Sequence, residues 1–295
     1  MKCSGIDLHI HSTASDGTVT PPEILQLALQ RNLCAISITD HDTLDGVKDA
    51  LARGIPDAIK FLTGIEISSD PPPGFSIPGS LHILGYGIST EDRPLNRMLD
   101  TLQGARLNRN PKIIERLNQA GLEVSLSEVL EKAGTGQAGR PHIAMVMVEK
   151  GMAASVNEAF SLFLGKGKPA YVDKPRTASS DVIRTILNAG GVPVLAHPGL
   201  VESESSETIQ RLVDSLKQEG LKGIEVYYPR HTPALIEEYK DLARRNDLLV
   251  TGGSDFHGSV YPDIEMGSGN GAGSIPYSIF EELIKGVATH DPFQA

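Results

Sequence analysis

Residues 7–12 read Asp7-Leu8-His9-Ile10-His11-Ser12, and the rest of the chain is organised around this stretch and the Asp16-Gly17 pair that follows it. The apolar run over residues 5–10 predicts a strand that delivers the two histidines at its end. Because side chains two residues apart on a strand point to the same face, His9 and His11 project together, with Cα atoms ~7 Å apart. This spacing suits chelation of one metal ion, although two surface histidines on an edge strand would show the same pattern.

The composition is that of a globular protein of enzyme size. The chain has 295 residues, 40% of them hydrophobic and 22% charged, which allows one large core, or one core with a small insertion. No apolar run reaches the ~18–20 residues of a membrane span, and the N-terminus lacks a signal-peptide pattern. No membrane partner is therefore expected. The net charge of −10 argues against a broad surface for binding nucleic acid, so a stable duplex partner is not expected either. Since Cys3 and Cys34 are the only cysteines, we expect a reducing, cytoplasmic location without a disulfide framework.

Strand and helix signals alternate along most of the chain. Thr20-Pro21-Pro22-Glu23 is a capping box with prolines in the first turn, which predicts the start of a helix. The break at residues 71–74 leaves no room for a helix before the next strand, so the strands on either side of it are predicted to form a hairpin. Seven strands are predicted in all, at residues 5–10, 35–39, 60–66, 81–86, 192–196, 223–227 and 248–251.

Residues 95–168 differ in character, because helix-like patterns dominate and strand signals are nearly absent. We interpret this segment as a small helical insertion, with residues 1–94 and 169–295 forming the main domain. The insertion carries Gly139-Arg140-Pro141-His142 in its middle and Gly165-Lys166-Gly167-Lys168 at its exit. Its helices are predicted at residues 95–103, 106–119, 127–133, 141–150 and 159–164.

The distribution of histidine is the strongest functional signal. Eight of the nine histidines lie at predicted strand ends or in the Arg140 motif: His9, His11, His41, His82, His142, His197, His231 and His257. Equivalent positions hold Asp16, Asp40, Glu66 and Asp255. In a barrel, one end gathers the loops that follow successive strands, and the chemistry is built there. Imidazoles and carboxylates without thiolates suit Zn²⁺, Mn²⁺ or Fe²⁺, so the sequence predicts a metal centre at this end.

The ordered motifs resemble a known family. His9-x-His11, Asp16, Asp40-His41-Asp42, Glu66, His82, His197-Pro198 and Ser254-Asp255-x-His257 are similar to the four motifs of the PHP (polymerase and histidinol phosphatase) superfamily. The Arg140 motif and Tyr227-Tyr228-Pro229-Arg230-His231 resemble the stand-alone branch that contains nucleoside 3′,5′-bisphosphate phosphatases and the 5′-to-3′ exoribonuclease that trims short RNAs. The resemblance implies an α/β fold, a distorted (β/α)₇ barrel, with a trinuclear metal centre. Mn²⁺ is the expected metal, with Zn²⁺ or Fe²⁺ as alternatives.

Carried over residue by residue, the resemblance implies three metal sites that share a ligand. The first site is surrounded by His9, His11, Glu66 and Asp255. Glu66 bridges to a second site held also by His82 and His197, and the third site takes Asp16, His41 and His257. Asp7 and Asp42 are expected to orient the histidines.

The expected chemistry is attack on phosphorus by a metal-activated hydroxide. We assign catalytic roles to His197, Arg140 and His231, and substrate binding to Arg140, His142, Lys166, Lys168 and His231. Arg140 is a bidentate phosphate ligand by type, and the Gly-spaced lysines could reach a second phosphate. The alternatives are a surface ion pair for Arg140 and a solvated turn for the two lysines.

The predicted function is hydrolysis of the 3′-phosphate of nucleoside 3′,5′-bisphosphates, of short 5′-phosphorylated oligonucleotides from the 5′ end, or of both. The partner is therefore a small nucleotide or a short single-stranded oligonucleotide. One alternative is a PHP phosphatase of another small phosphomonoester such as histidinol phosphate, against which the long insertion weighs. Another is a non-catalytic regulator that keeps the metal site, against which the complete ligand set argues.

Overall fold

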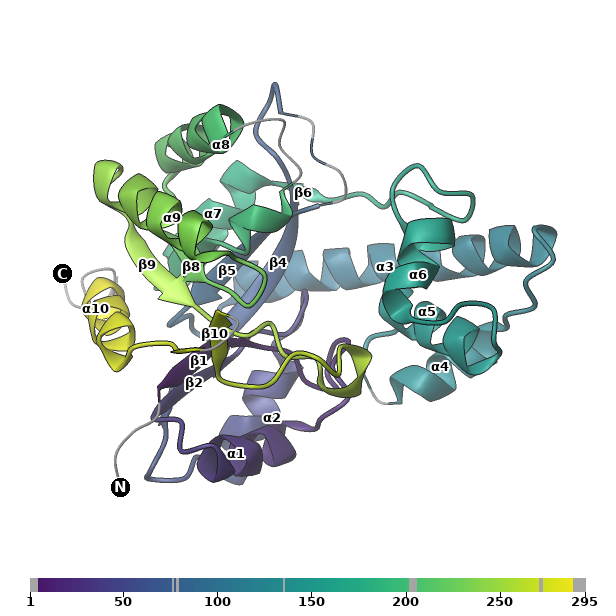
Figure 1. Ribbon diagram of the computed structural model, residues 1–295, viewed down its shortest axis with the longest axis horizontal. Helices are drawn as coiled ribbons and strands as arrows, with labels where there is room; N and C mark the ends of the chain where they lie inside the picture. The colour runs from purple at the N-terminus through teal and green to yellow at the C-terminus, as the bar shows by residue number, and fades with distance from the viewer. Residues whose placement is uncertain are drawn as a thin grey trace.

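The computed structural model describes residues 5–75, 77, 80–134, 136–201, 206–270 and 273–288. Its strands are gathered centrally, with helices around them and a separate group of helices to one side (Figure 1). In the described part of the chain, a three-stranded parallel sheet is formed by β1 (Ile6–Ile10), β2 (Ala35–Ile38) and β3 (Lys60–Phe61). A six-stranded sheet follows the order β6 (Thr177–Ala178), β4 (Gly64–Asp70), β5 (Leu81–Tyr86), β7 (Val192–Leu195), β8 (Gly223–Tyr227) and β9 (Leu249–Gly252).

All seven predicted strands are present, and the predicted hairpin is confirmed. β4 and β5 pair antiparallel from Gly64 opposite Tyr86 to Ser69 opposite Leu81. The segment 60–66, predicted as one strand, is divided between β3 in one sheet and β4 in the other. The chain therefore changes sheets at residues 62–63, directly before the strand that carries Glu66.

The two sheets are connected only at isolated positions within the described residues. Single bridges join Ile10 to Phe256 and His41 to Glu66, both in the parallel sense. Because strand pairing is divided between two sheets, the predicted distorted barrel is not confirmed as a continuous ring. These bridges join the end of β1 to the segment after β9, and the segment after β2 to β4.

Helices cover the outer faces of the sheets and bury apolar side chains against them. The capping box predicted at Thr20 is confirmed, since the backbone N–H of Thr20 donates to the Glu23 carboxylate. Strands β1, β2 and β7 are buried along their whole length. The helices of this part are α1 (Pro21–Gln30), α2 (Asp45–Arg53), α7 (Ser179–Asn188), α8 (Ser206–Glu219), α9 (Pro233–Arg245) and α10 (Tyr277–Ala288); a short pair, β10 (Ser268–Asn270) and β11 (Gly273–Ser274), precedes α10.

The segment between β5 and β6 is helical, as predicted, but its first helix is longer. The two helices predicted at residues 95–103 and 106–119 are one continuous helix, α3 (Arg93–Gln119). Leu95, Leu99 and Leu102 in its first half pack in the core that also covers the six-stranded sheet. Its second half packs in a separate core (Figure 1) with α4 (Leu126–Ala133), α5 (Arg140–Glu149), α6 (Val156–Ala159) and the π-helical turn Phe160–Leu164.

Two expectations from composition have different outcomes. Within the described residues, no helix combines the length and the apolar character needed to span a membrane. Cys34 is disulfide-bonded, contrary to the expectation of a chain without disulfides. Cys3, the other cysteine of the sequence, lies outside the described residues.

Gly253, which follows β9, allows that strand to approach the metal-binding end of β1. A Cβ at this position would lie 2.2 Å from the Cβ and 2.3 Å from the backbone nitrogen of His9. We expect Gly253→Ala to lower the free energy of unfolding by ~1–3 kcal/mol, because the backbone must shift to relieve this overlap. Denaturant unfolding measures the change.

The matched control is Gly104→Ala, since a Cβ at Gly104 in α3 has no neighbour within 4 Å. Alanine there should stabilise the helix by ~0.5–1 kcal/mol. Equal effects of the two substitutions would contradict the role given to Gly253.

Candidate metal centre

Glu66 lies within β4, fully buried, and imidazole rings surround its carboxylate. It follows Ile65 and precedes Ile67 in an almost entirely buried strand, so its charge is held in an apolar sheet. The ring nitrogens within 3.2 Å of its two oxygens are those of His82 (2.8 Å) and His197 (2.9 Å) at Oε1, and of His11 (3.1 Å), His41 (3.1 Å) and His9 (3.2 Å) at Oε2.

All nine predicted metal ligands come together around this carboxylate. Their ligand atoms form groups in which every member lies within 4.8 Å of the others. The group of His9, His11, Glu66 and Asp255 is the same as the first implied site. The group of Asp16, His41 and His257 is the third implied site, with His11 as an additional member. A third group places His41 beside Glu66 and His82. His197 Nε2 is 3.3 Å from His82 Nδ1, so His197 adjoins this last group.

The residues fit divalent cations. Glu66 Oε2 and His41 Nδ1 are both buried and lie 3.1 Å apart, yet neither makes a hydrogen bond of suitable geometry to a described residue. His9 Nε2 and His11 Nε2 face each other at 3.2 Å, where two unprotonated nitrogens would repel without a proton or a cation nearby. A set of imidazoles and carboxylates without thiolates is chemically suited to Mn²⁺, Zn²⁺ or Fe²⁺.

The buried charges shift one another's pKa values. Burial acts to raise the pKa of Glu66, but the surrounding histidines, His41 and His82 foremost, hold it well below its usual range. Burial acts to lower the pKa of His11, but its contacts with Asp255 and Glu66 raise it to about 10. Burial lowers the pKa of His41 to about 3 despite the neighbouring carboxylates. The carboxylates therefore remain ionised, which gives the centre the negative charge that a cation requires.

Unusual backbone conformations orient several side chains of the metal centre. His197 has a φ of 26° and Asp255 a φ of 55°, and Asp42, beside His41, has a φ of 54°. Side-chain-bearing residues rarely adopt the left-handed region, which costs of order ~1–3 kcal/mol at each position. The backbone N–H of Asp255 donates to His9 O at 2.8 Å, and that of His197 donates to Glu225 Oε2 at 2.8 Å. The surrounding hydrogen bonds hold the turns in place.

Glu225 is a functional residue that the sequence interpretation missed. It is fully buried in β8, and its Oε1 lies 3.0 Å from His9 Nδ1, which turns His9 Nε2 toward Glu66. A carboxylate that accepts the second ring N–H of a ligating histidine fixes the orientation of the ring. A charged residue inside the apolar run Gly223-Ile224-Glu225-Val226 was the available signal.

Asp7 and Asp42 both act on neighbouring segments through their carboxylates. Asp7 accepts hydrogen bonds from the backbone and hydroxyl of Ser254, and burial raises the pKa of Asp7 to about 6. Asp42 accepts from the backbone N–H of Ser68, from Arg106 Nε and Nη2 at 2.9 and 2.7 Å, and from Lys174 Nζ at 3.2 Å. Arg106 and Lys174 were not predicted to belong to the site.

A cavity of about 210 Å³ is lined both by residues of the histidine cluster and by cationic side chains. Arg140 lines it, as the sequence predicted for a phosphate ligand. Arg106, Arg109 and Lys174 line it too. Arg109 is buried without a hydrogen bond or ion pair from its guanidinium to any described residue, and its Nε has no partner. Burial, with the charges of Arg140 and Arg106, lowers the pKa of Arg109 to about 9.

The other predicted substrate residues are not among those that line the cavity. His142 Nδ1 accepts the backbone N–H of Gly139 at 3.0 Å, and Lys166 Nζ donates to Ile77 O at 2.9 Å. His231 donates from Nδ1 to Val226 O at 2.8 Å and accepts the N–H of Gly199 at Nε2 at 3.2 Å. Lys168 is exposed. These side chains contact backbone or solvent, so Arg140 is the one predicted substrate residue of the insertion that lines the cavity, and its contact with substrate stays a prediction.

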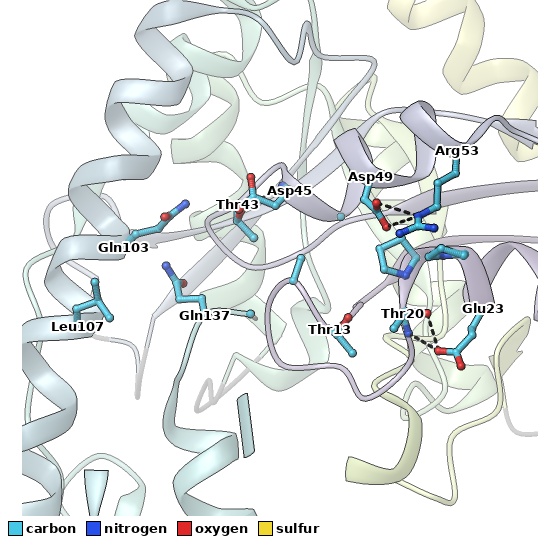
Figure 2. Close-up of a pocket in the computed structure, with 15 residues that line it drawn as sticks. Thr13, Thr20, Glu23, Thr43, Asp45, Asp49, Arg53, Gln103, Leu107 and Gln137 are labelled. Atoms are coloured by element: carbon cyan, nitrogen blue, oxygen red, sulfur yellow. Dashed lines mark hydrogen bonds and ion pairs between the residues drawn. The ribbon is translucent and has the colours of Figure 1, made fainter. Parts of the chain in front are cut away.

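A larger cavity, of about 740 Å³, lies between α1, α2, α3 and residues 136–137 (Figure 2). Its lining includes Glu23, Asp45 and Asp49, and its one lining arginine, Arg53, is paired with Asp49. Figure 2 shows this pair and the contact of Thr20 with Glu23. An acidic lining does not suit a phosphate, so the smaller cavity beside the histidines is the candidate site.

The sequence matches the PHP domain over residues 7–258. The chain belongs to this family. It is 31% identical to the 3′,5′-nucleoside bisphosphate phosphatase of Chromobacterium violaceum, over 86% of this chain and 87% of the relative. It is 32% identical to the 5′-3′ exoribonuclease Rnm of Escherichia coli, over 88% and 87% of the two chains.

The fold agrees with that membership. A solved structure designated a metal-dependent phosphoesterase, from Bifidobacterium adolescentis, superimposes with a TM-score of 0.83 and 29% identity, covering 96% of each chain. The architecture is therefore the PHP-type α/β fold, which is built to present His, Asp and Glu side chains at one end.

Glu66→Gln tests the shared carboxylate. A neutral amide cannot replace a charge that five imidazoles surround, so bound metal should fall by more than the ~10–100-fold change in affinity that follows loss of a supporting group. Metal content after dialysis against limiting Mn²⁺ measures the loss, and thermal unfolding checks that the chain still folds. Glu237→Gln, on the exposed face of α9, is the matched control. Unchanged metal content in Glu66→Gln would refute the assignment of Glu66 as a shared ligand.

Proposed function

We propose that this PHP protein removes the 3′-phosphate from nucleoside 3′,5′-bisphosphates and shortens 5′-phosphorylated oligonucleotides from the 5′ end. The observation that carries the proposal is that one cavity is lined both by the carboxylates and imidazoles of the metal centre and by Arg106, Arg109, Arg140 and Lys174. A substrate with phosphates at two places suits such a cavity. The names of the phosphatase and exoribonuclease relatives support the same substrate class.

The proposed cofactor is a set of three divalent cations, Mn²⁺ by preference, with Zn²⁺ or Fe²⁺ as alternatives. When bound, they supply positive charge to the equatorial oxygens of the phosphoryl group and activate water for attack. The chain holds them through Glu66 and the histidines around it. Glu225 keeps His9 in the required orientation, and Asp42 fixes the loop that carries His41.

We assign the second phosphate to Arg109 and Arg140. The guanidinium of Arg140 stacks near the rings of Phe160 and Tyr171, at 5.4 and 5.6 Å from their centroids, and its Nη1 donates to Leu164 O. These contacts hold Arg140 in place and leave other N–H groups available for a phosphate. Arg109 has no anionic partner in the described chain, so a phosphate would neutralise a buried charge.

We also propose that residues 95–168 cap the metal-binding end. The core formed by the second half of α3 with α4–α6 is separate from the core under the six-stranded sheet, which supports an inserted unit. The two sheets are interpreted as parts of one distorted barrel, since the bridges at Ile10 and His41 join their edges.

Arg140→Ala tests the second phosphate site. Losing a charge-assisted contact costs ~1.5–3 kcal/mol, so kcat/KM for a nucleoside 3′,5′-bisphosphate should fall roughly ten- to a hundredfold. For 4-nitrophenyl phosphate, which has one phosphate, the loss should be much smaller. Arg184→Ala, on the exposed face of α7, is the matched control. Equal losses on both substrates would show that Arg140 serves folding and not phosphate binding.

The end-group preference tests the proposed function as a whole. Two versions of one short RNA, with a 5′-phosphate and with a 5′-hydroxyl, are compared under the same Mn²⁺ and salt. The phosphorylated RNA should be degraded at least about tenfold faster, because its terminal phosphate occupies the arginine site while the next linkage meets the metals. Mononucleotides should be released from the 5′ end. Equal rates, or release from the 3′ end, would refute the two-phosphate arrangement.

A further inference from the structure

We propose that Lys174 is a catalytic residue whose ammonium group gives its proton to the leaving oxygen of the phosphate ester. The inference rests on the proposed function, because only an alkyl leaving group such as a ribose 3′-oxygen requires a proton donor. Lys174 lies in the segment before β6, buried, and lines the cavity beside the histidine cluster. None of the metal motifs contains it.

The described walls of the cavity offer few groups that could supply a proton. Arginines keep their protons at neutral pH, and Pro141, Phe160 and Leu200 have none to give. Seven further lining residues are candidate metal ligands: Asp16, His41, Glu66, His82, His197, Asp255 and His257. The side chains that remain are those of Ser68, Ser80, Tyr261 and Lys174.

Lys174 is the best suited of these four. Burial raises the pKa of Tyr261 to about 12, too high for an efficient acid near neutral pH. The Ser80 hydroxyl is hydrogen bonded to His82, and Ser68 Oγ accepts from Arg106 Nη2. For Lys174, burial and the charge of Arg106 lower the pKa to about 7, against the opposing attraction of Asp42.

The contacts of Lys174 hold its ammonium group without using all of its protons. Nζ donates to Asp42 Oδ2 at 3.2 Å, the same oxygen that accepts Arg106 Nε and Nη2. No other hydrogen bond from Nζ reaches a described residue. Because Asp42 directly follows His41, this single carboxylate places the ammonium group next to the metal-binding loop. The charged groups with the largest effect on the pKa of Lys174 are Arg106, Asp42 and Arg109.

The proposed step balances. Water releases one proton to solvent, and the resulting hydroxide forms a bond to phosphorus while the bond between phosphorus and the 3′-oxygen breaks and its electron pair stays on that oxygen. One N–H proton of Lys174 moves to the oxygen, which leaves as the alcohol. The lysine is then a neutral amine and recovers a proton from solvent. Asp42 and Arg106 remain unchanged, and Asp42 holds the ammonium group of this cavity-lining residue.

The decisive comparison uses Lys174→Met and Lys174→Arg on two substrates in the Mn²⁺-loaded enzyme. The bisphosphate has an alkyl leaving group, whereas the phenolate of 4-nitrophenyl phosphate leaves without being protonated. General acid catalysis is worth ~10²–10⁴-fold, so kcat for the bisphosphate should fall by that factor in both variants. For 4-nitrophenyl phosphate the loss should stay below about tenfold. Thermal unfolding checks the fold, and Lys285→Met in α10 is the matched control.

Lys174→Arg separates proton donation from charge. It keeps the positive charge but cannot release a proton, so a normal rate on the bisphosphate would overturn the proposal in favour of a phosphate-binding role. Equal losses on both substrates would overturn it as well. Wild-type turnover of the bisphosphate reports on the proposed function separately. If it is absent, the proposed function fails, and the role of Lys174 fails with it.

Two further measurements report on the ionisation of the Lys174 ammonium group. In the wild type, kcat for the bisphosphate should fall on the alkaline side as Lys174 loses its proton, and this limb should be missing with 4-nitrophenyl phosphate. Independently of activity, acetylation of Lys174 with acetic anhydride is followed by peptide mass spectrometry as a function of pH. The midpoint of its reactivity should lie clearly below that of Lys285. An identical midpoint for the two lysines would overturn the proposal.

Discussion

The central constraint in this structure is a carboxylate, that of Glu66, held in a buried strand and surrounded by imidazole nitrogens. A charge without water is costly, and here it is offset by neighbours that come from four other strand ends. That requirement explains the arrangement of the sheets. β1 and β2 belong to one sheet and β4 to another, yet the residues at their ends must lie close together. The isolated bridges at Ile10 and His41 hold these ends in place. The rare φ angles at His197 and Asp255 follow from the same demand.

The sequence predicted those parts of the fold and of the metal centre whose signals lie in short stretches of the chain. The histidines and acids that follow strands could be located because strand periodicity and strand order place them, and the β4–β5 hairpin followed from a proline-rich connection. Glu225 was missed because it lies inside a strand, where its neighbours suggest only burial. Arg106 and Arg109 were missed because their role depends on how α3 docks, and Lys174 was missed because the segment before β6 meets Asp42, which is distant in the sequence. No pattern along the chain encodes that contact.

The motif residues that did not reach the cavity are equally informative. His142 and His231 occupy motif positions, but their ring nitrogens bond to backbone groups that shape the start of α5 and the turn after β7. A motif records that a residue is needed, and it does not distinguish contact with a ligand from support of a turn. The helices predicted separately at residues 95–103 and 106–119 are one helix, α3, whose two halves pack in two different cores.

The continuity of α3 has a consequence for how such a protein can diverge. Arg106 reaches Asp42 only because a fixed number of residues separates it from the start of the helix at Arg93. One inserted residue in that interval would rotate the guanidinium by about 100° around the helix axis and turn it away from the cavity. No residue of α3 beyond Arg109 lines the cavity, so the phase of the helix is less constrained there. Changes in length should therefore accumulate in the loops between the distal helices, where Arg140 can keep its place at the cavity, while the spacing between residues 93 and 109 stays constant.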